Sequence, residues 1–462
     1  MTEHSPFVPE AVLRAALARG GEWAEVFYER AGYASVLLED GRVEEARGGV
    51  RNGAGVRVVE GERTWYGHAT APRPTDLEDL AREVARTRSG ATKGTGGIRS
   101  VPPLDETEPG RPLPLDPRAE LCRRLDRVVR AVDPRIRQVR VVFREQDQDV
   151  WVCASDGRFV RERRPGFYLG VLVVASGDGV LQTGYEALGA SVPWDAFQDG
   201  PEKAEAAAVR AARRAVRMLT APRAPGGRMP VVIAGEAGGT MIHEAVGHGL
   251  EADLVLEGHS VYAGRVGETI ASPLVTVVDD PTLPGRRGSY RFDDEGTPAR
   301  RTVLVERGVL LGFLHSRVTA ARMGVDPTGH GRRESFEHLP MPRMANTFIA
   351  PGPHDPDEIL RSTPSGLYVT RMGGGQVNTV SGDFVFEVAE GYRIEGGEKG
   401  EPVRGAVLVG NGPRVLREID RVGSDLGFAV GTCGKDGQGV PVADAQPTIR
   451  IPELVVGGEA AS

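Results

Sequence analysis

The chain of 462 residues has 57 Lys and Arg against 64 Asp and Glu, which gives a formal net charge of −7. Acidic and basic residues are interspersed, and no apolar run approaches the roughly 18 residues of a membrane span, so we expect neither a nucleic-acid partner nor a membrane partner. The length exceeds what one hydrophobic core usually serves and predicts two domains.

The first quarter of the chain has the pattern of a helix, several short strands and a second helix. Apolar residues first recur at helical spacing and then alternate with polar ones, and Asp40-Gly41 is a hairpin signal. The predicted elements are a helix at 10–19, strands at 23–30, 35–45, 56–59 and 64–68, and a helix at 75–87.

A similar order of elements follows a segment rich in Gly, Pro, Ser and Thr over 88–116, which we interpret as a loop or linker. We expect a helix over 117–132, strands between 136 and 181, and a long helix rich in Ala and Arg over 201–219. Helix and strands thus occur twice, which is consistent with an internal duplication.

The clearest linker is Ala-Pro-Arg-Ala-Pro-Gly-Gly at 221–227, and short strands with Gly and Pro turns dominate beyond it. Few helices are expected there, one of them at 356–362. We therefore predict an α+β protein of two domains. A mixed α/β domain would span 1–222, and a β-rich domain carrying the metal site would span 223–462.

The segment His243-Glu244-Ala245-Val246-Gly247-His248 carries the strongest chemical signal. Imidazoles bind divalent transition metals, and a carboxylate beside them can take a proton from a water that the metal activates. Residues of these types, so close together, favour a metal-dependent hydrolase. The other interpretation is two ordinary histidines at the end of a glycine-rich helix.

The spacing of the two histidines is unusual, because residues five apart point about 140° away from each other on a regular α-helix. Two local structures would bring them together. One is a π-bulge, in which His248 lies beneath His243. The other is a helix that stops at Gly247, with His248 pointing back from an irregular turn.

Further segments resemble the TldD family of metallopeptidases, the TldD/PmbA group, whose members have also been called modulators of DNA gyrase. The similarity is strong from about residue 230 and weaker before it. Besides the histidine segment and its flanks, it covers 277–280, 293–298, 331–335, 338–344, 373–377 and 433–438.

The resemblance implies that His243, His248 and Cys433 hold one divalent metal ion per chain and that Glu244 is the general base. Zinc suits this donor set, and ferrous iron or cobalt would also bind. Because none of the four residues is missing, the chain matches the metal-binding TldD-type subunit. Its sister subunit, PmbA or TldE, lacks the metal motif and pairs with TldD.

The sequence around Cys433 supports its assignment independently. Cys122 and Cys153 lie in patterns typical of core positions, whereas Cys433 lies in a turn-like Gly-Thr-Cys-Gly-Lys segment. Backbone amides and the charge of Lys435 would favour the thiolate, which is the metal-binding form. Three dispersed cysteines also argue against a disulfide scaffold. Together with an N-terminus that lacks a signal-peptide pattern, they predict a cytoplasmic protein.

Two histidines and one thiolate leave a fourth metal position for water, as in catalytic sites. The resemblance implies unfolded or extended peptides as substrates, and a homodimer or a heterodimer with a TldE/PmbA-like subunit. Peptides can be held by strand addition to a sheet edge. The alternatives are a non-catalytic scaffold or regulatory subunit with a structural metal, and a metallohydrolase that acts on other substrates.

Two further sets of polar residues are weaker candidates. Arg332, Arg333, His338 and Arg343 cluster in one polar segment and are candidates to stabilise the oxyanion, although a solvated loop explains the segment equally well. His259 is interpreted as a surface residue rather than a partner of the metal ligands.

Overall fold

The computed structural model describes residues 8–88, 98–99 and 112–459, and it has an α+β architecture built on three main sheets. Most of the linker predicted at 88–116 lies outside the described residues. Within the described part of the chain, no helix is both long and apolar enough to cross a membrane.

The N-terminal half forms a six-stranded antiparallel sheet in the order β3-β2-β1-β4-β5-β6. Two successive three-stranded meanders pair through their first strands, β1 and β4, which is the arrangement that a duplication would give; the duplication itself stays a prediction. The strands are β1 (Trp23–Glu39), β2 (Arg42–Glu60), β3 (Arg63–Thr70), β4 (Ile136–Ala154), β5 (Phe159–Gly177) and β6 (Val180–Ala190).

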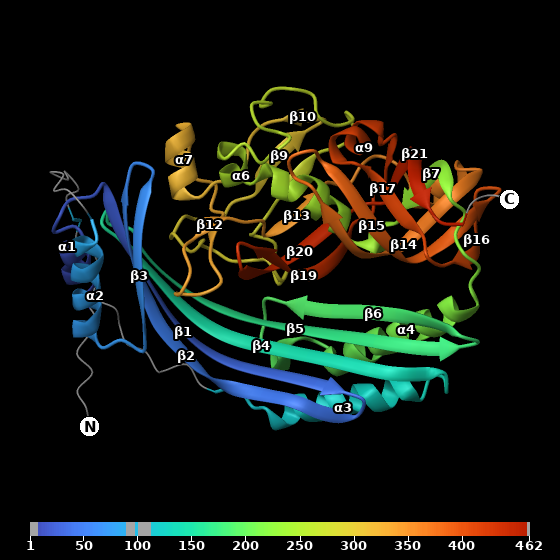
Figure 1. Ribbon diagram of the computed structural model, residues 1–462, viewed down its shortest axis with the longest axis horizontal. Helices are drawn as coiled ribbons and strands as arrows, with labels where there is room; N and C mark the ends of the chain where they lie inside the picture. The colour runs from blue at the N-terminus through green and yellow to red at the C-terminus, as the bar shows by residue number, and fades with distance from the viewer. Residues whose placement is uncertain (1–7, 89–97, 100–111, 460–462) are drawn as a thin grey trace.

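Helices cover one face of this long, curved sheet, and the C-terminal half rests against the other face (Figure 1). Alternate strand residues pack on the helices, as the two-residue period of a strand requires. The helices are α1 (Pro9–Ala16), α2 (Pro74–Arg86), α3 (Asp116–Arg130) and α4 (Gly200–Thr220), with a 3-10 turn η1 (Trp194–Ala196) before α4.

Five strands of the C-terminal half close into a ring in the order β14-β7-β21-β17-β15, because β15 also pairs with β14. Two more strands, β16 and β18, extend it. The bounds are β7 (Gly227–Ile233), β14 (Ser365–Val377), β15 (Asp383–Glu395), β16 (Glu398–Val403), β17 (Val407–Asn411), β18 (Arg421–Val422) and β21 (Ile449–Gly457).

A third sheet, in the order β10-β9-β8-β13-β20-β19, lies beside the ring, and its last two strands form the β19–β20 hairpin on the side toward the N-terminal sheet (Figure 1). A small pair, β11–β12, lies beside it. The bounds are β8 (Val277–Asp279), β9 (Thr302–Glu306), β10 (Val309–Leu310), β11 (Gly331–Arg332), β12 (Met341–Pro342), β13 (Asn346–Ile349), β19 (Gly427–Lys435) and β20 (Gln438–Gln446).

Short helices connect these strands. They include α8 (Pro356–Arg361), at the place predicted from the sequence, and the segments that carry His243 and His248. The full set is η2 (Gly235–Ala237), α5 (Thr240–Ile242), η3 (His243–Gly247), η4 (His248–Leu250), α6 (Ala252–Leu256), α7 (Arg317–Met323), α8 and α9 (Gly412–Glu418).

The two halves meet in a buried network of charges. Nη2 of Arg333 lies 2.6 Å from Oε1 of Glu25 in β1, and Nη2 of Arg57 in β2 lies 2.5 Å from Oε1 of Glu295. Because buried charges are costly unless they are paired, these contacts fix how the sheet and the C-terminal half sit against each other. The domain boundary predicted between residues 222 and 223 stays a prediction.

Candidate metal centre

The two histidines of the His-Glu segment lie on one continuous helical stretch. It begins as the single α-turn α5, continues as the π-turn η3 over His243–Gly247, and ends as the 3-10 turn η4 from His248. The wider π-turn places residues five apart on the same side. Of the two alternatives from the sequence, the π-bulge is the one observed.

Close packing against β20 sets the position of this stretch. The N–H of Gly239 donates to the carbonyl of Asp444 over 3.2 Å. A Cβ at Gly239 would lie 2.3 Å from the backbone nitrogen of Ala445, which leaves no space for a side chain. Glycine is therefore required where the helical stretch starts, and the stretch is held directly on the strand that carries Asp444.

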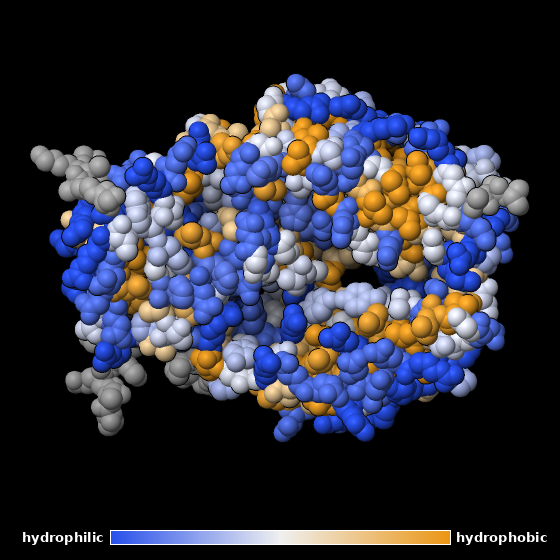
Figure 2. Space-filling view, viewed as in Figure 1, coloured by the Kyte–Doolittle hydropathy of each residue, from blue (hydrophilic) through white to orange (hydrophobic). Residues whose placement is uncertain are grey.

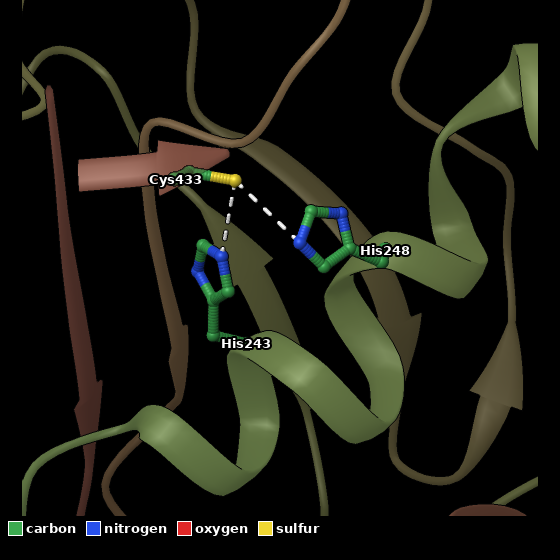
Figure 3. Close-up of side chains that lie close together, drawn as sticks. All are labelled: His243, His248 and Cys433. Carbon is green, nitrogen blue, oxygen red and sulfur yellow. Dashed lines mark hydrogen bonds between the residues drawn. The ribbon is translucent and has the colours of Figure 1, made fainter. Parts of the chain in front are cut away.

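His243, His248 and Cys433 point toward one another (Figure 3). Sγ of Cys433 lies 3.2 Å from Nε2 of His243 and 3.5 Å from Nε2 of His248. One potential ligand atom from each residue lies within 4.8 Å of the others, and in the described part of the chain this is the one cluster of its kind. Residues about 190 positions apart in sequence are thus brought to a single point, as a metal centre requires.

A carboxylate orients each imidazole from behind. Nδ1 of His243 lies 2.7 Å from Oδ1 of Asp444, and Nδ1 of His248 lies 2.9 Å from Oε2 of Glu251. Because a carboxylate accepts, Nδ1 carries the proton and Nε2 faces the thiol. This carboxylate–histidine arrangement is typical of metal-binding histidines. Neither acidic residue was predicted from the sequence.

The pKa of the Cys433 thiol is lowered to about 6. Burial alone would raise this pKa, but the charges of His243 and His248 and their hydrogen bonds to Sγ outweigh burial. By contrast, burial raises the pKa of Cys122 to about 12 and also raises that of Cys153. Of the three cysteines, Cys433 is thus the one held in the thiolate form that binds metal.

The pKa values of both histidines are raised by the negatively charged groups around them. Burial alone would lower both pKa values, but Asp444 and Cys433 raise the pKa of His243 well above its ordinary value, and Glu251 and Cys433 raise that of His248 to about 10. A cation bound here would take the place of the protons on these histidines and compensate the thiolate and the two carboxylates. Two imidazoles and a thiolate, each rigidly held, fit zinc.

Two cations hold the hairpin that carries Cys433. Nη2 of the fully buried Arg343 donates to the carbonyl of Cys433 over 2.5 Å. Nζ of Lys435 donates to Glu251 over 3.0 Å and to Asp253 over 2.7 Å. The cation near the thiol noted in the sequence therefore acts through the carboxylate that orients His248.

The carboxylate of Glu244 is half-buried and makes no hydrogen bond or ion pair with any residue the structure describes. It lies in the π-turn between the two histidines. No contact among the described residues assigns this carboxylate a structural role.

The polar segment of Arg332, Arg333 and Arg343 is buried, so the solvated-loop interpretation was wrong. Arg343 reaches the Cys433 carbonyl, whereas Arg333 belongs to the network with Glu25. His338 is half-buried, with Nδ1 3.0 Å from Oγ of Ser335. His259 is exposed, in agreement with its interpretation as a surface residue.

Three sequence models of PmbA/TldA metallopeptidase domains match this chain, namely domain 1 at residues 24–91, the central domain at 108–219 and the C-terminal domain at 226–458. The Haemophilus influenzae "Metalloprotease TldD homolog" is 38% identical over 451 residues, covering 95% of this chain and 94% of that protein. The chain belongs to the PmbA/TldD metallopeptidase family.

Relatives in this family carry metalloprotease names across distant organisms. A "Metalloprotease" of Methanothermobacter thermautotrophicus is 35% identical, covering 95% of this chain and 96% of its own length. A "Zinc metalloprotease TldD homolog" of Saccharolobus solfataricus is 34% identical over 247 residues, covering 53% of this chain and 55% of that protein.

Solved structures share the fold of this PmbA/TldD chain. TldE of Thermococcus kodakarensis has a TM-score of 0.73 at 18% identity, covering 97% of this chain and 99% of its own. A Thermotoga maritima protein has a TM-score of 0.76 at 23% identity, and the match covers 96% of this chain and 98% of that protein.

Proposed function

We propose that this chain is a metal-dependent peptidase that hydrolyses peptide bonds in unfolded or extended peptides. One observation carries the proposal. Nε2 of His243, Nε2 of His248 and Sγ of Cys433 converge, while the carboxylate of Glu244 beside them has no partner among the described residues. Structural zinc usually has four protein ligands, whereas three with a free carboxylate nearby favour catalysis.

His243, His248 and Cys433 would hold one divalent ion, which we propose to be zinc. When bound, the ion supplies Lewis-acid activation of a water molecule and of the scissile carbonyl. Glu244 takes a proton from that water as its oxygen attacks the carbonyl carbon. The same carboxylate then gives the proton to the amine nitrogen as the carbon–nitrogen bond breaks. Asp444 and Glu251 keep the two imidazoles in the required tautomer.

The edge of the hairpin supports the extended-peptide part of the proposal. β19 is the last strand of its sheet. Within the described residues, the backbone amides of Val430, Thr432 and Gly434 donate to no backbone or side-chain acceptor. A peptide can pair with this edge through main-chain hydrogen bonds, which requires an unfolded substrate and little sequence preference.

We also propose a dimer as the working form, either a homodimer or a heterodimer with a TldE/PmbA-like chain. The fold that this chain shares with the solved TldE supports a pairing between similar subunits. The two proposed domains, 1–222 and 223–462, would each contribute one face of the space between the curved sheet and the β19–β20 hairpin.

A comparison of the native chain with Glu244→Gln tests the function. We expect one metal ion per chain in both proteins, cleavage of an unfolded protein such as reduced casein by the native chain, and loss of that cleavage in the variant. Equal cleavage by both would reject Glu244 as the base. Metal in both without cleavage, even after addition of a TldE-like chain, would favour a scaffold with a structural metal. Small esters cleaved in place of peptides would indicate another hydrolase.

A further inference from the structure

A cleft of about 480 Å³ lies between the bare face of the N-terminal sheet and the β19–β20 hairpin, and a second of about 410 Å³ adjoins it. Arg144 of β4 and Thr432 of β19 line both. The space-filling view shows the molecule hollowed between its two halves (Figure 2). Thr432 directly precedes Cys433 in the sequence, so the residue next to the proposed metal ligand lines both clefts.

Six arginines line the larger cleft, and three of them are neutralised by carboxylates. Arg51 pairs with Glu29, Arg164 with Asp294 and Arg333 with Glu25. The remaining three, Arg144, Arg287 and Arg332, have no carboxylate hydrogen-bonded to them within the described residues.

Arg287 and Arg332 are held in place by backbone carbonyls. Nε of Arg287 donates to Gly431 over 3.1 Å, and Nη2 of Arg332 donates to Pro441 over 2.9 Å. A Cβ at Gly189 of β6 would lie 2.8 Å from Cδ of Arg287, so glycine allows this arginine to cross the sheet closely. The pKa of Arg287 is lowered to about 10, mainly by burial; Tyr168 opposes this shift, and the charges of Arg144 and Arg332 add to it. These cations repel one another, and an anion would relieve the repulsion.

Arg144 differs because its side chain is exposed and makes no hydrogen bond or ion pair to the described residues. Most acidic side chains that line the larger cleft already have an ion-pair or hydrogen-bond partner. Glu145 pairs with Arg118, and Asp293 accepts from three backbone amides. Glu334 is exposed, and its carboxylate accepts from the amide of Gly439 close to Thr432, so one negative charge stands there against the three arginines without a carboxylate. The part of the cleft near Thr432 therefore carries excess positive charge.

We propose that this cleft is a subsite for a carboxylate of the peptide substrate, with Arg144 as the direct partner and Arg287 and Arg332 providing a fixed positive field. The inference rests on the proposed peptidase function and names a preferred substrate class, peptides with a carboxylate close to the cleaved bond. Side chains alternate along a strand, so Thr432 faces away from the side that Cys433 faces. A peptide paired with β19 would likewise direct the side chain next to the cleaved bond toward the arginines.

Three fluorescent, unstructured peptides of one sequence test this subsite. The first has Glu at a central position and an amidated C-terminus, the second has Gln and the amide, and the third has Gln and a free C-terminal carboxylate. Binding is measured by anisotropy on the zinc-loaded full chain carrying Glu244→Gln, which keeps the peptides intact. We expect at least one carboxylate peptide to bind about tenfold more tightly than the Gln amide, as charge-assisted hydrogen bonds do.

The ratio of the two affinities, carboxylate peptide over Gln amide, should fall to about one when Arg144→Gln is added. Without that substitution, higher salt should also reduce the ratio. Arg137→Gln, at an exposed arginine of the same strand outside both clefts, should leave it at about ten. A preference for the Glu peptide identifies a side-chain subsite, and one confined to the free terminus identifies a terminal-carboxylate subsite.

Equal binding of the three peptides, no binding at all, or a preference that survives Arg144→Gln would overturn the proposal. The outcome is separable from that of the peptidase proposal. A native chain that cleaves all three peptides equally well, while its Glu244→Gln form binds them equally, rejects the subsite alone. Preferential binding without any cleavage by the native chain rejects the peptidase alone.

Discussion

Asp444 lies 201 residues after His243, and its carboxylate accepts a hydrogen bond from Nδ1 of that histidine at 2.7 Å. The same residue accepts the backbone N–H of Gly239 through its carbonyl. One residue of β20 therefore fixes both the start of the helical stretch and the direction in which its first histidine points.

Replacing Asp444 with Asn should weaken zinc binding by about 10- to 100-fold, because a neutral amide, which can also turn its NH2 group toward Nδ1, replaces the charged acceptor that holds the tautomer of the imidazole. Competition with a chromophoric chelator measures this change. Asp436→Asn, at the exposed turn of the same hairpin, is the matched control and should bind zinc like the native chain. Equal zinc affinity in both variants would show that Asp444 does not orient a metal ligand.

Gly239→Ala should displace the helical stretch from β20, since the new methyl group meets backbone that cannot move aside. We expect a loss of about 1–3 kcal/mol in the free energy of unfolding and weaker zinc binding. Gly374→Ala is the control, because a Cβ at Gly374 meets nothing within 4 Å. Urea unfolding and zinc titration of both variants test this point, and an unchanged Gly239→Ala protein would contradict it.

Removing Arg333 should leave the buried carboxylate of Glu25 without its closest cation, with Nε of Arg57 at 3.6 Å as the one ion-pair partner that remains among the described residues. Arg333→Ala is therefore expected to lower the free energy of unfolding by about 3–5 kcal/mol. Arg163→Ala breaks a pair with Asp147 whose arginine side chain is 62% exposed, and it should cost less than about 1 kcal/mol. Denaturant unfolding compares the two, and similar losses would mean that the buried network does not hold the halves together.

His315 should make stability depend on pH. Burial and the nearby His330 lower the pKa of His315 to about 4, below its ordinary value of 6.5. The folded state thus favours the neutral ring, and the stabilisation is complete above pH 6.5 and is lost as the pH falls toward 4. The loss is at most about 3 kcal/mol. His315→Gln should lose less stability between pH 7 and pH 4 than the native chain, as seen in unfolding midpoints, and identical pH profiles would refute this role.

The periodicity of apolar residues was enough to predict an α+β chain. It nevertheless predicted separate strands at 35–45 and 56–59, whereas the structure has one continuous strand β2 over Arg42–Glu60. β2 has glycines in its middle, which normally interrupt a strand. For Gly53 the reason is a tertiary contact. A Cβ at Gly53 would lie 2.3 Å from the ring of Phe336, from the other half of the chain. No local pattern contains that contact.

The candidate metal centre was predictable only in part, for a similar reason. His243, His248 and Glu244 are close in sequence, and the family resemblance added Cys433. Asp444 could not be predicted, because no spacing marks its contact with His243. The choice between a π-turn and a broken helix was also open, because glycines at 247 and 249 permit both.

The ligand set itself is tested most directly by zinc K-edge X-ray absorption on the zinc-loaded native chain and on Cys433→Ser. The account predicts one sulfur at about 2.3 Å and nitrogen ligands at about 2.0–2.1 Å in the native chain, with the sulfur contribution absent from the variant. A native spectrum without sulfur, or a sulfur contribution that survives Cys433→Ser, would contradict a metal centre made of His243, His248 and Cys433.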